Sequence, residues 1–459
     1  MLPTDRQQRD AVDSLVEEFT QQGLSRRAFI QRAVALGLSA SAATSILAAC
    51  GNNSGGSSSV SSVNLLTTWG STELDSFKAV VDPFTKQSGI TVKVDATRDL
   101  DAILTTRIRG NNPPDLAILP NPAKMQQLAA QNKLVALDSL VDMSKLQSDY
   151  AKTWLDLGSF NGKLYAIFYK AANKGTVWYS PKTFQSAGYT IPKTFDDMVS
   201  LSSRIASSGK FPWSMGVSSG AASGWPATDW IAEILLNQSG PDVYDQWVAH
   251  KIPWTDSKIK SAFQEFGRIA FGKHFINGAP QSILATDPQP ASYLPFKSPP
   301  AAYMYYLGDF AAGFITSQFK SIQPGTGFDF FPFPTINPQF QGGVTIGADL
   351  VVAMKNNNGV RDLVRYLATA PAQEIWVKRG GFTAVNKSVP LSAYPDKVAQ
   401  ASAQQLTSAT AGKYGAGDIM PPAMQQAWWK GMLAYIGNQG SLDSVLASLE
   451  NTAKSAYAS

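Results

Sequence analysis

Strand-like and helix-like segments alternate along the chain after its amino-terminal region, and this pattern restricts the possible folds more than any other feature. A β-rich run at residues 63–68 precedes a segment at 74–88 whose apolar residues recur at helical spacing. An alternating strand at 90–94, a helix at 100–109 and a short apolar strand at 116–119 follow. This order predicts an α/β fold in which helices cover both faces of a mostly parallel sheet.

Two extended segments predict that the chain crosses between two lobes. Residues 162–170 form an apolar run that is too long for one ordinary strand, and residues 342–349 form a second candidate crossing. We expect each lobe to be a mostly parallel sheet with flanking helices, and hinge strands to join the lobes. The predicted boundaries are 63–168 with 347–395 for the first lobe, and 169–346 with 396–459 for the second.

The first 49 residues have the composition of an export signal. Arg26 and Arg27 stand just before Phe29, and residues 33–49 are uncharged and rich in Ala, Ser, Gly and Leu. A charged region, a short apolar region and small residues before a cleavage point are typical of such signals. A membrane-spanning helix is the alternative, but the uncharged run is short for one and weakly hydrophobic.

Cys50 is the only cysteine in the chain, and the tripeptide Leu-Ala-Ala directly precedes it. This arrangement resembles a bacterial lipobox, in which the cysteine is acylated and becomes the first residue of the mature protein. Residues 50–62 are then almost entirely Gly, Ser and Asn, which predicts a flexible tether. We therefore expect an extracytoplasmic protein that a lipid on Cys50 anchors to the cell membrane.

Charge and histidine content argue against several kinds of partner and chemistry. The formal net charge is +5, but Lys and Arg are scattered singly, so we expect no nucleic-acid partner. The two histidines, His250 and His274, lie far from any cysteine or carboxylate cluster. They leave little material for a zinc site or a catalytic triad, and we expect neither a metal nor a cofactor.

Aromatic residues are plentiful, with 11 Trp, 15 Tyr and 23 Phe. Several tryptophans, such as Trp69, Trp225 and Trp254, stand beside Gly, Pro and polar residues instead of inside apolar runs. Indole rings in such places suit the apolar faces of sugar rings, while polar neighbours bind the hydroxyl groups. Core packing is the alternative for each of them.

Short motifs follow one another along the mature chain, at residues 112–117 (Asn-Pro-Pro-Asp-Leu-Ala), 160–165, 177–181, 187–189, 192–197, 380–386 and 419–421. Together they resemble the extracellular solute-binding proteins of carbohydrate importers, the relatives of maltose-binding protein. Three further segments resemble the α-glucoside-binding branch of this family, at 119–122, 224–230 and 240–247. Residues 293–296 lack a cysteine-containing segment of that branch.

The resemblance implies a monomeric, non-enzymatic protein with two α/β lobes. It would capture an α-glucoside or another oligosaccharide by closing its cleft and deliver it to an ABC-type permease. By position, the implied ligand-binding residues are Trp69, Ser71, Glu73, Asn121, Trp225, Asp229, Phe310, Asp349 and Trp428. Two alternatives stay open: a secreted glycoside hydrolase, which needs two suitably spaced carboxylates, and a binding protein for a solute that is not a sugar.

Overall fold

The computed structural model describes Arg32 and residues 61–458. Cys50 and almost all of the predicted signal and tether therefore lie outside the described residues. Residues 61–458 belong to one compact unit, and its buried apolar side chains gather mainly into two large cores. These two cores correspond to two lobes.

The larger sheet belongs to the first lobe and has seven strands among the described residues, in the order β12-β6-β11-β3-β1-β2, with β13 beside β11. Its strands are β1 (Ser62–Thr67), β2 (Thr91–Ala96), β3 (Leu116–Leu119), β6 (Ala166–Asn173), β11 (Gly343–Ala353), β12 (Thr383–Ala384) and β13 (Ala411–Tyr414). Strand β1 pairs in parallel with β2 and β3, whereas β11 is antiparallel to both β3 and β6. The sheet is therefore mixed.

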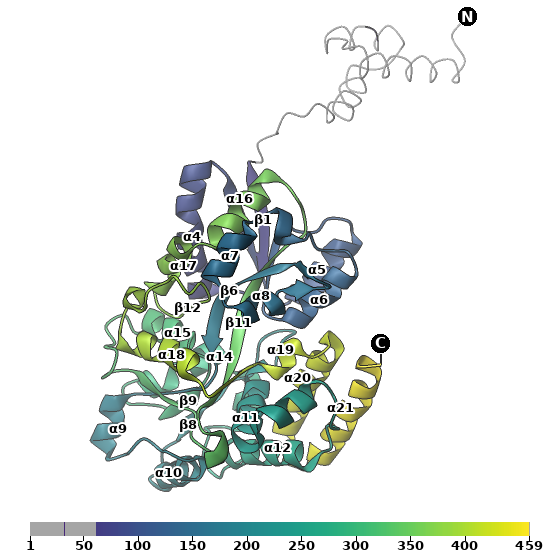
Figure 1. The fold of residues 1–459 in the computed structure, drawn as a ribbon. Helices are drawn as coiled ribbons and strands as arrows, with labels where there is room; N and C mark the ends of the chain where they lie inside the picture. The colour runs from purple at the N-terminus through teal and green to yellow at the C-terminus, as the bar shows by residue number, and fades with distance from the viewer. Residues whose placement is uncertain (1–31, 33–60, 459) are drawn as a thin grey trace, which may run out of the picture. The chain divides into compact units, whose positions relative to one another are not determined.

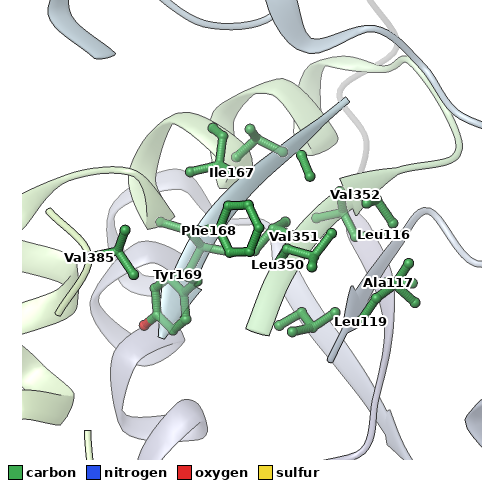
Figure 2. Packing of buried hydrophobic residues seen from close by; sticks show 14 of the residues in the cluster. Leu116, Ala117, Leu119, Ile167, Phe168, Tyr169, Leu350, Val351, Val352 and Val385 are labelled. Carbon is green, nitrogen blue, oxygen red and sulfur yellow. The ribbon is translucent and has the colours of Figure 1, made fainter. Parts of the chain in front are cut away.

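Helices pack on this sheet through one apolar face each. They include α4 (Ser71–Ser88), α5 (Leu100–Arg109), α6 (Pro122–Ala130), α16 (Asn358–Leu367) and α17 (Ala370–Val377). In α4 the buried side chains Phe77, Val80, Val81 and Phe84 recur at helical spacing, as the sequence predicts. Figure 2 shows the centre of this core, where apolar side chains of the central strands β3, β6 and β11 lie together.

The second lobe contains a smaller sheet in the order β10-β7-β9-β8. Its strands are β7 (Thr176–Tyr179), β8 (Trp213–Ser214), β9 (Met304–Tyr306) and β10 (Asp329–Pro332). Only the β8–β9 pair is parallel, so the prediction of a mostly parallel sheet is wrong for this lobe. The reason is the chain path: β7 carries the chain into the lobe and β10 carries it back toward β11, so these neighbours run in opposite directions.

Five helices form most of the second core: α10 (Phe195–Ser207), α11 (Trp225–Val248), α12 (Ser257–Ala270), α20 (Pro422–Gly437) and α21 (Leu442–Ala456). The shorter helix α15 (Ala311–Gln318) belongs to a separate, smaller apolar cluster. Helix α11 is broken at Gly240, whose φ is +83°, and Pro241 follows it. A Cβ atom at Gly240 would come within 2.4 Å of the Phe340 ring, so the break and the close approach both require glycine here.

Strands β6 and β11 connect the two lobes, as Figure 1 shows, and both extended segments predicted as crossings fall on or beside them. Their pairing shifts register between Asp349 and Leu350. The chain crosses again after β13, through the short helix α19 (Ala416–Ile419) that leads into α20. The first core reaches Tyr414, beyond the lobe boundary predicted at residue 395.

Candidate ligand-binding site

The candidate site is a cavity between the two lobes, at the ends of β1 and β3 and along β6 and β11. Residues from the first turns of α11 and from α19 complete its walls. The cavity measures about 1140 Å³, including space that is continuous with solvent. Its position beyond the carboxyl ends of parallel strands is the common place for ligands in α/β folds.

Trp69, directly after β1, forms a fixed wall of this cavity. Its side chain is only 2% exposed and packs edge-on against Trp376, with 4.8 Å between the ring centroids. Its indole Nε1 donates a hydrogen bond to Oδ2 of Asp349 at 2.9 Å. Trp69 therefore both shapes the wall and holds a carboxylate in place.

Two lysines on the connecting segment that contains β6 extend into the cavity. Lys170 forms an ion pair with Glu73 of α4, and its ammonium lies 5.0 Å from the Trp376 ring centroid and 5.3 Å from that of Phe310. Lys174, just after β6, donates to Oδ2 of Asp229 of α11 at 2.6 Å. One segment thus supplies an ammonium group to a carboxylate of each lobe.

The pair between Lys174 and Asp229 is almost withdrawn from solvent. Burial raises the pKa of Asp229 above its usual value, although Lys174 opposes this effect. Burial would lower the pKa of Lys174, but the negative charges of Asp229, Asp418 and Asp349 raise it. Because Lys174 stays charged, it favours the ionised form of Asp229 at neutral pH.

Asp349 on β11 and Asp418 on α19 also face the cavity. Burial raises the pKa of Asp349, and it raises the pKa of Asp418 to about 7. One oxygen of Asp418 accepts a hydrogen bond from Nε2 of Gln425 at 2.9 Å. The cavity thus contains one carboxyl group, that of Asp418, whose protonation changes near neutral pH.

The aromatic walls come mainly from the second lobe. Trp225 is the first residue of α11, and its ring lies 6.1 Å from that of Phe310. Gly224 precedes it with φ of +106°, and a Cβ there would come within 2.4 Å of the Trp429 carbonyl oxygen. Only glycine therefore permits α11 to begin so close to α20. Trp429 of α20 also lines the cavity.

Six of the nine residues predicted from the sequence line the cavity: Trp69, Glu73, Trp225, Asp229, Phe310 and Asp349. Ser71 lies outside the cavity, is exposed and receives a 3.4 Å hydrogen bond from Nε2 of Gln289. Asn121 is buried and donates to Gln425 of the other lobe at 2.9 Å. These two residues contact the opposite lobe instead of the cavity.

The prediction for Trp428 is wrong. Its side chain is fully buried in the second core, where its ring meets Trp247 at 5.0 Å and Trp254 at 5.3 Å in near-perpendicular contacts. The cavity wall at this point is the next residue, Trp429. Successive residues on a helix point about 100° apart, so one step along α20 separates the core face from the cavity face.

Sequence reasoning also missed Lys170, Lys174 and Asp418. Both lysines end or follow the long run at 162–170 that is predicted to cross between the lobes, and charged residues at the end of a strand usually mark its exit into solvent. Asp418 stands immediately before the motif at 419–421. That proximity was the available signal for it.

Across the described residues, no helix is long and apolar enough to cross a membrane.

Comparisons with known proteins identify the family. The chain matches the family described as bacterial extracellular solute-binding proteins over residues 69–374. The osmoprotective compounds-binding protein GgtB of Synechocystis sp. is 33% identical over 356 residues, which are 77% of this chain and 84% of GgtB. The α-glucosides-binding periplasmic protein AglE of Rhizobium meliloti is 33% identical over 379 residues, which are 80% of this chain and 81% of AglE.

Solved structures share the fold at low sequence identity. The bacterial solute receptor AcbH, which prefers β-D-galactopyranose, is 20% identical with a TM-score of 0.76 over 86% of this chain and 99% of its own. A chitin oligosaccharide binding protein is 19% identical with a TM-score of 0.76 over 87% and 100%. The two-lobed α/β fold and the function of a solute-binding protein predicted from the sequence are thus confirmed, and the chain belongs to the family of bacterial extracellular solute-binding proteins.

Proposed function

We propose that the protein binds a carbohydrate in the cavity between its lobes and delivers it to the permease of an ABC-type importer. An α-glucoside or another oligosaccharide is the proposed ligand. Cys50 would hold the protein at the outer face of the cell membrane as a monomer. The protein would bind its ligand without changing it.

The observation that carries this proposal is the combination of carboxylates and aromatic rings in one cavity. Asp229, Asp349 and Asp418 each have one oxygen held by a protein donor, which leaves the second for a ligand. An ionised carboxylate only accepts hydrogen bonds, so the matching ligand must donate them. Sugar hydroxyls donate, and the rings of Trp225 and Trp429 suit the apolar faces of pyranoses.

Two kinds of relative narrow the ligand class. AglE binds α-glucosides, and GgtB binds osmoprotective compounds, according to their names. Both proteins share a third of their aligned residues with this chain. A neutral, hydroxyl-rich α-glucoside is compatible with both and with the donor requirement of the cavity.

Calorimetric titration of the purified protein with maltose, trehalose, sucrose and glucosylglycerol tests the proposal. We expect stoichiometric binding of at least one of them, and mass spectrometry should recover that ligand unchanged. Recovery of hydrolysed sugar would instead favour the glycoside hydrolase. Binding of none of these compounds, together with a different solute that copurifies with the protein, would favour a ligand that is not a sugar.

A further inference from the structure

Asn121 and Gln425 form a buried contact between the lobes. Asn121 follows β3 of the first lobe, whereas Gln425 lies in the first turn of α20, which packs in the second core. Nδ2 of Asn121 donates to Oε1 of Gln425 at 2.9 Å, and the two residues are only 4% and 1% exposed. This contact therefore exists only while the lobes are together.

The side chain of Gln425 also donates a hydrogen bond to a carboxylate of the ligand cavity. Nε2 of Gln425 donates to Oδ1 of Asp418 at 2.9 Å, and Asp418 lines the cavity. Because an ionised carboxylate only accepts, the amide nitrogen of Gln425 must face Asp418 and its oxygen must face Asn121. The charge state of Asp418 thus sets the direction of the whole chain of hydrogen bonds.

The contact leaves one polar atom without a partner, which argues against a purely structural role. Within the described residues, Oδ1 of Asn121 is buried and makes no hydrogen bond. An unsatisfied buried acceptor opposes stability, so an apolar contact at this position would stabilise the closed arrangement better. The polar pair offers something that an apolar contact would not, namely a connection to Asp418.

We propose that Gln425 is a positioning residue that couples closure of the lobes to the orientation of Asp418 toward the ligand. This inference rests on the proposed ligand cavity but not on the identity of the ligand. When the lobes close, Asn121 fixes the amide of Gln425, and the amide fixes the Asp418 carboxylate. When they open, water replaces Asn121 and the carboxylate loses its fixed orientation.

The coupling predicts a kinetic effect of Gln425→Ala. We expect ligand release to become about five- to tenfold faster, because the variant loses one or two buried hydrogen bonds. The association rate should stay within about twofold of the wild type. Stopped-flow measurement uses whichever α-glucoside binds in the titration above. The ligand-free variant should still unfold near the wild-type melting temperature, because the loss of one or two hydrogen bonds lowers it by only about a few degrees.

Two further variants separate coupling from general damage. Asn121→Ala should accelerate release similarly, and the double variant Asn121→Ala/Gln425→Ala should add little to either single change. Asp99→Ala is the matched control. It removes another hydrogen bond between the lobes, from the Ala221 amide at 3.0 Å. This bond is exposed and, although Arg98 and Ala222 beside it line the cavity, it does not connect to a carboxylate of the cavity. We expect its release rate to match the wild type.

A readout without ligand keeps the test independent of the proposed carbohydrate. Energy transfer between dyes on one exposed residue of each lobe should show a more open ligand-free ensemble for Gln425→Ala than for Asp99→Ala. Additive single effects, unchanged release, or equal opening in the two variants would overturn the coupling. Failure of the wild type to bind any α-glucoside would overturn only the proposed ligand.

Discussion

Trp428 and Trp429 are neighbours in α20 with the same side chain, and the structure assigns them opposite roles. Trp428 is fully buried among Trp247 and Trp254, whereas Trp429 lines the cavity. Replacing each with alanine therefore gives a matched pair of variants. We expect the first to affect folding and the second to affect ligand binding.

The magnitudes follow from these surroundings. Truncation of a fully buried tryptophan costs about 3–5 kcal/mol of unfolding free energy, because it removes apolar contacts and leaves a cavity. Trp428→Ala should therefore unfold at clearly lower denaturant concentration, while its folded fraction binds ligand normally. Trp429→Ala should lose ring stacking of about 0.5–1.5 kcal/mol plus the burial of the ring by the sugar, roughly a tenfold loss of affinity.

Calorimetric titration beside denaturant unfolding distinguishes the two effects. The ligand concentration in the titration must exceed the dissociation constant of the weaker variant. If Trp428→Ala unfolded like the wild type but bound weakly, the assignment of Trp428 to the core would be refuted. Normal affinity of Trp429→Ala would remove that ring from the proposed site.

Four other predictions concern charge, attachment and motion. Asp229→Asn should weaken sugar binding roughly tenfold or more, because a charge-assisted acceptor is lost and Lys174 loses its partner; titration of the folded variant measures this. Ligand hydroxyls favour the ionised form of Asp418, whose pKa is about 7 without ligand. Sugar affinity should therefore fall as the pH drops below about 7 and stay constant above it. Titrations across that range should show a flatter profile for Asp418→Asn. Cys50→Ala should abolish lipid attachment in mass spectra of the membrane fraction, and a wild-type protein without lipid would contradict this expectation. Ligand should reduce the radius of gyration in small-angle scattering, and an unchanged scattering profile would contradict closure of the lobes.

Local sequence patterns were sufficient for most elements of the first lobe. Helix α5 (Leu100–Arg109) and strand β3 (Leu116–Leu119) have the predicted bounds, because their apolar spacing and flanking Gly, Asn and Pro residues act within a few positions. The directions of the strands in the second sheet were not predictable in this way. Strand β8 has two residues, and its pairing with β9 depends on segments far apart in the sequence.

The candidate site was predictable where a residue follows a strand or begins a helix, as Trp69 and Trp225 do. It was not predictable where one step of helical phase decides the outcome. Both tryptophans of α20 fit an apolar helix, and only packing against Trp247 and Trp254 determines which one is buried. Lys170 and Lys174 were missed because the carboxylates that allow their burial come from α4 and α11.

The lysines on the connecting segment have a consequence for which solutes the cavity excludes. Five acidic and three basic side chains line it, so the empty cavity has an excess of formal negative charge: Glu73, Asp229, Asp287, Asp349 and Asp418 against Arg98, Lys170 and Lys174. Lys170 and Lys174 are already paired with Glu73 and Asp229. A phosphorylated or uronic sugar would bring further negative charge into this field, and the remaining cation, Arg98, is exposed, so solvent screens its charge. We therefore expect the cavity to bind neutral glycans in preference to their anionic derivatives.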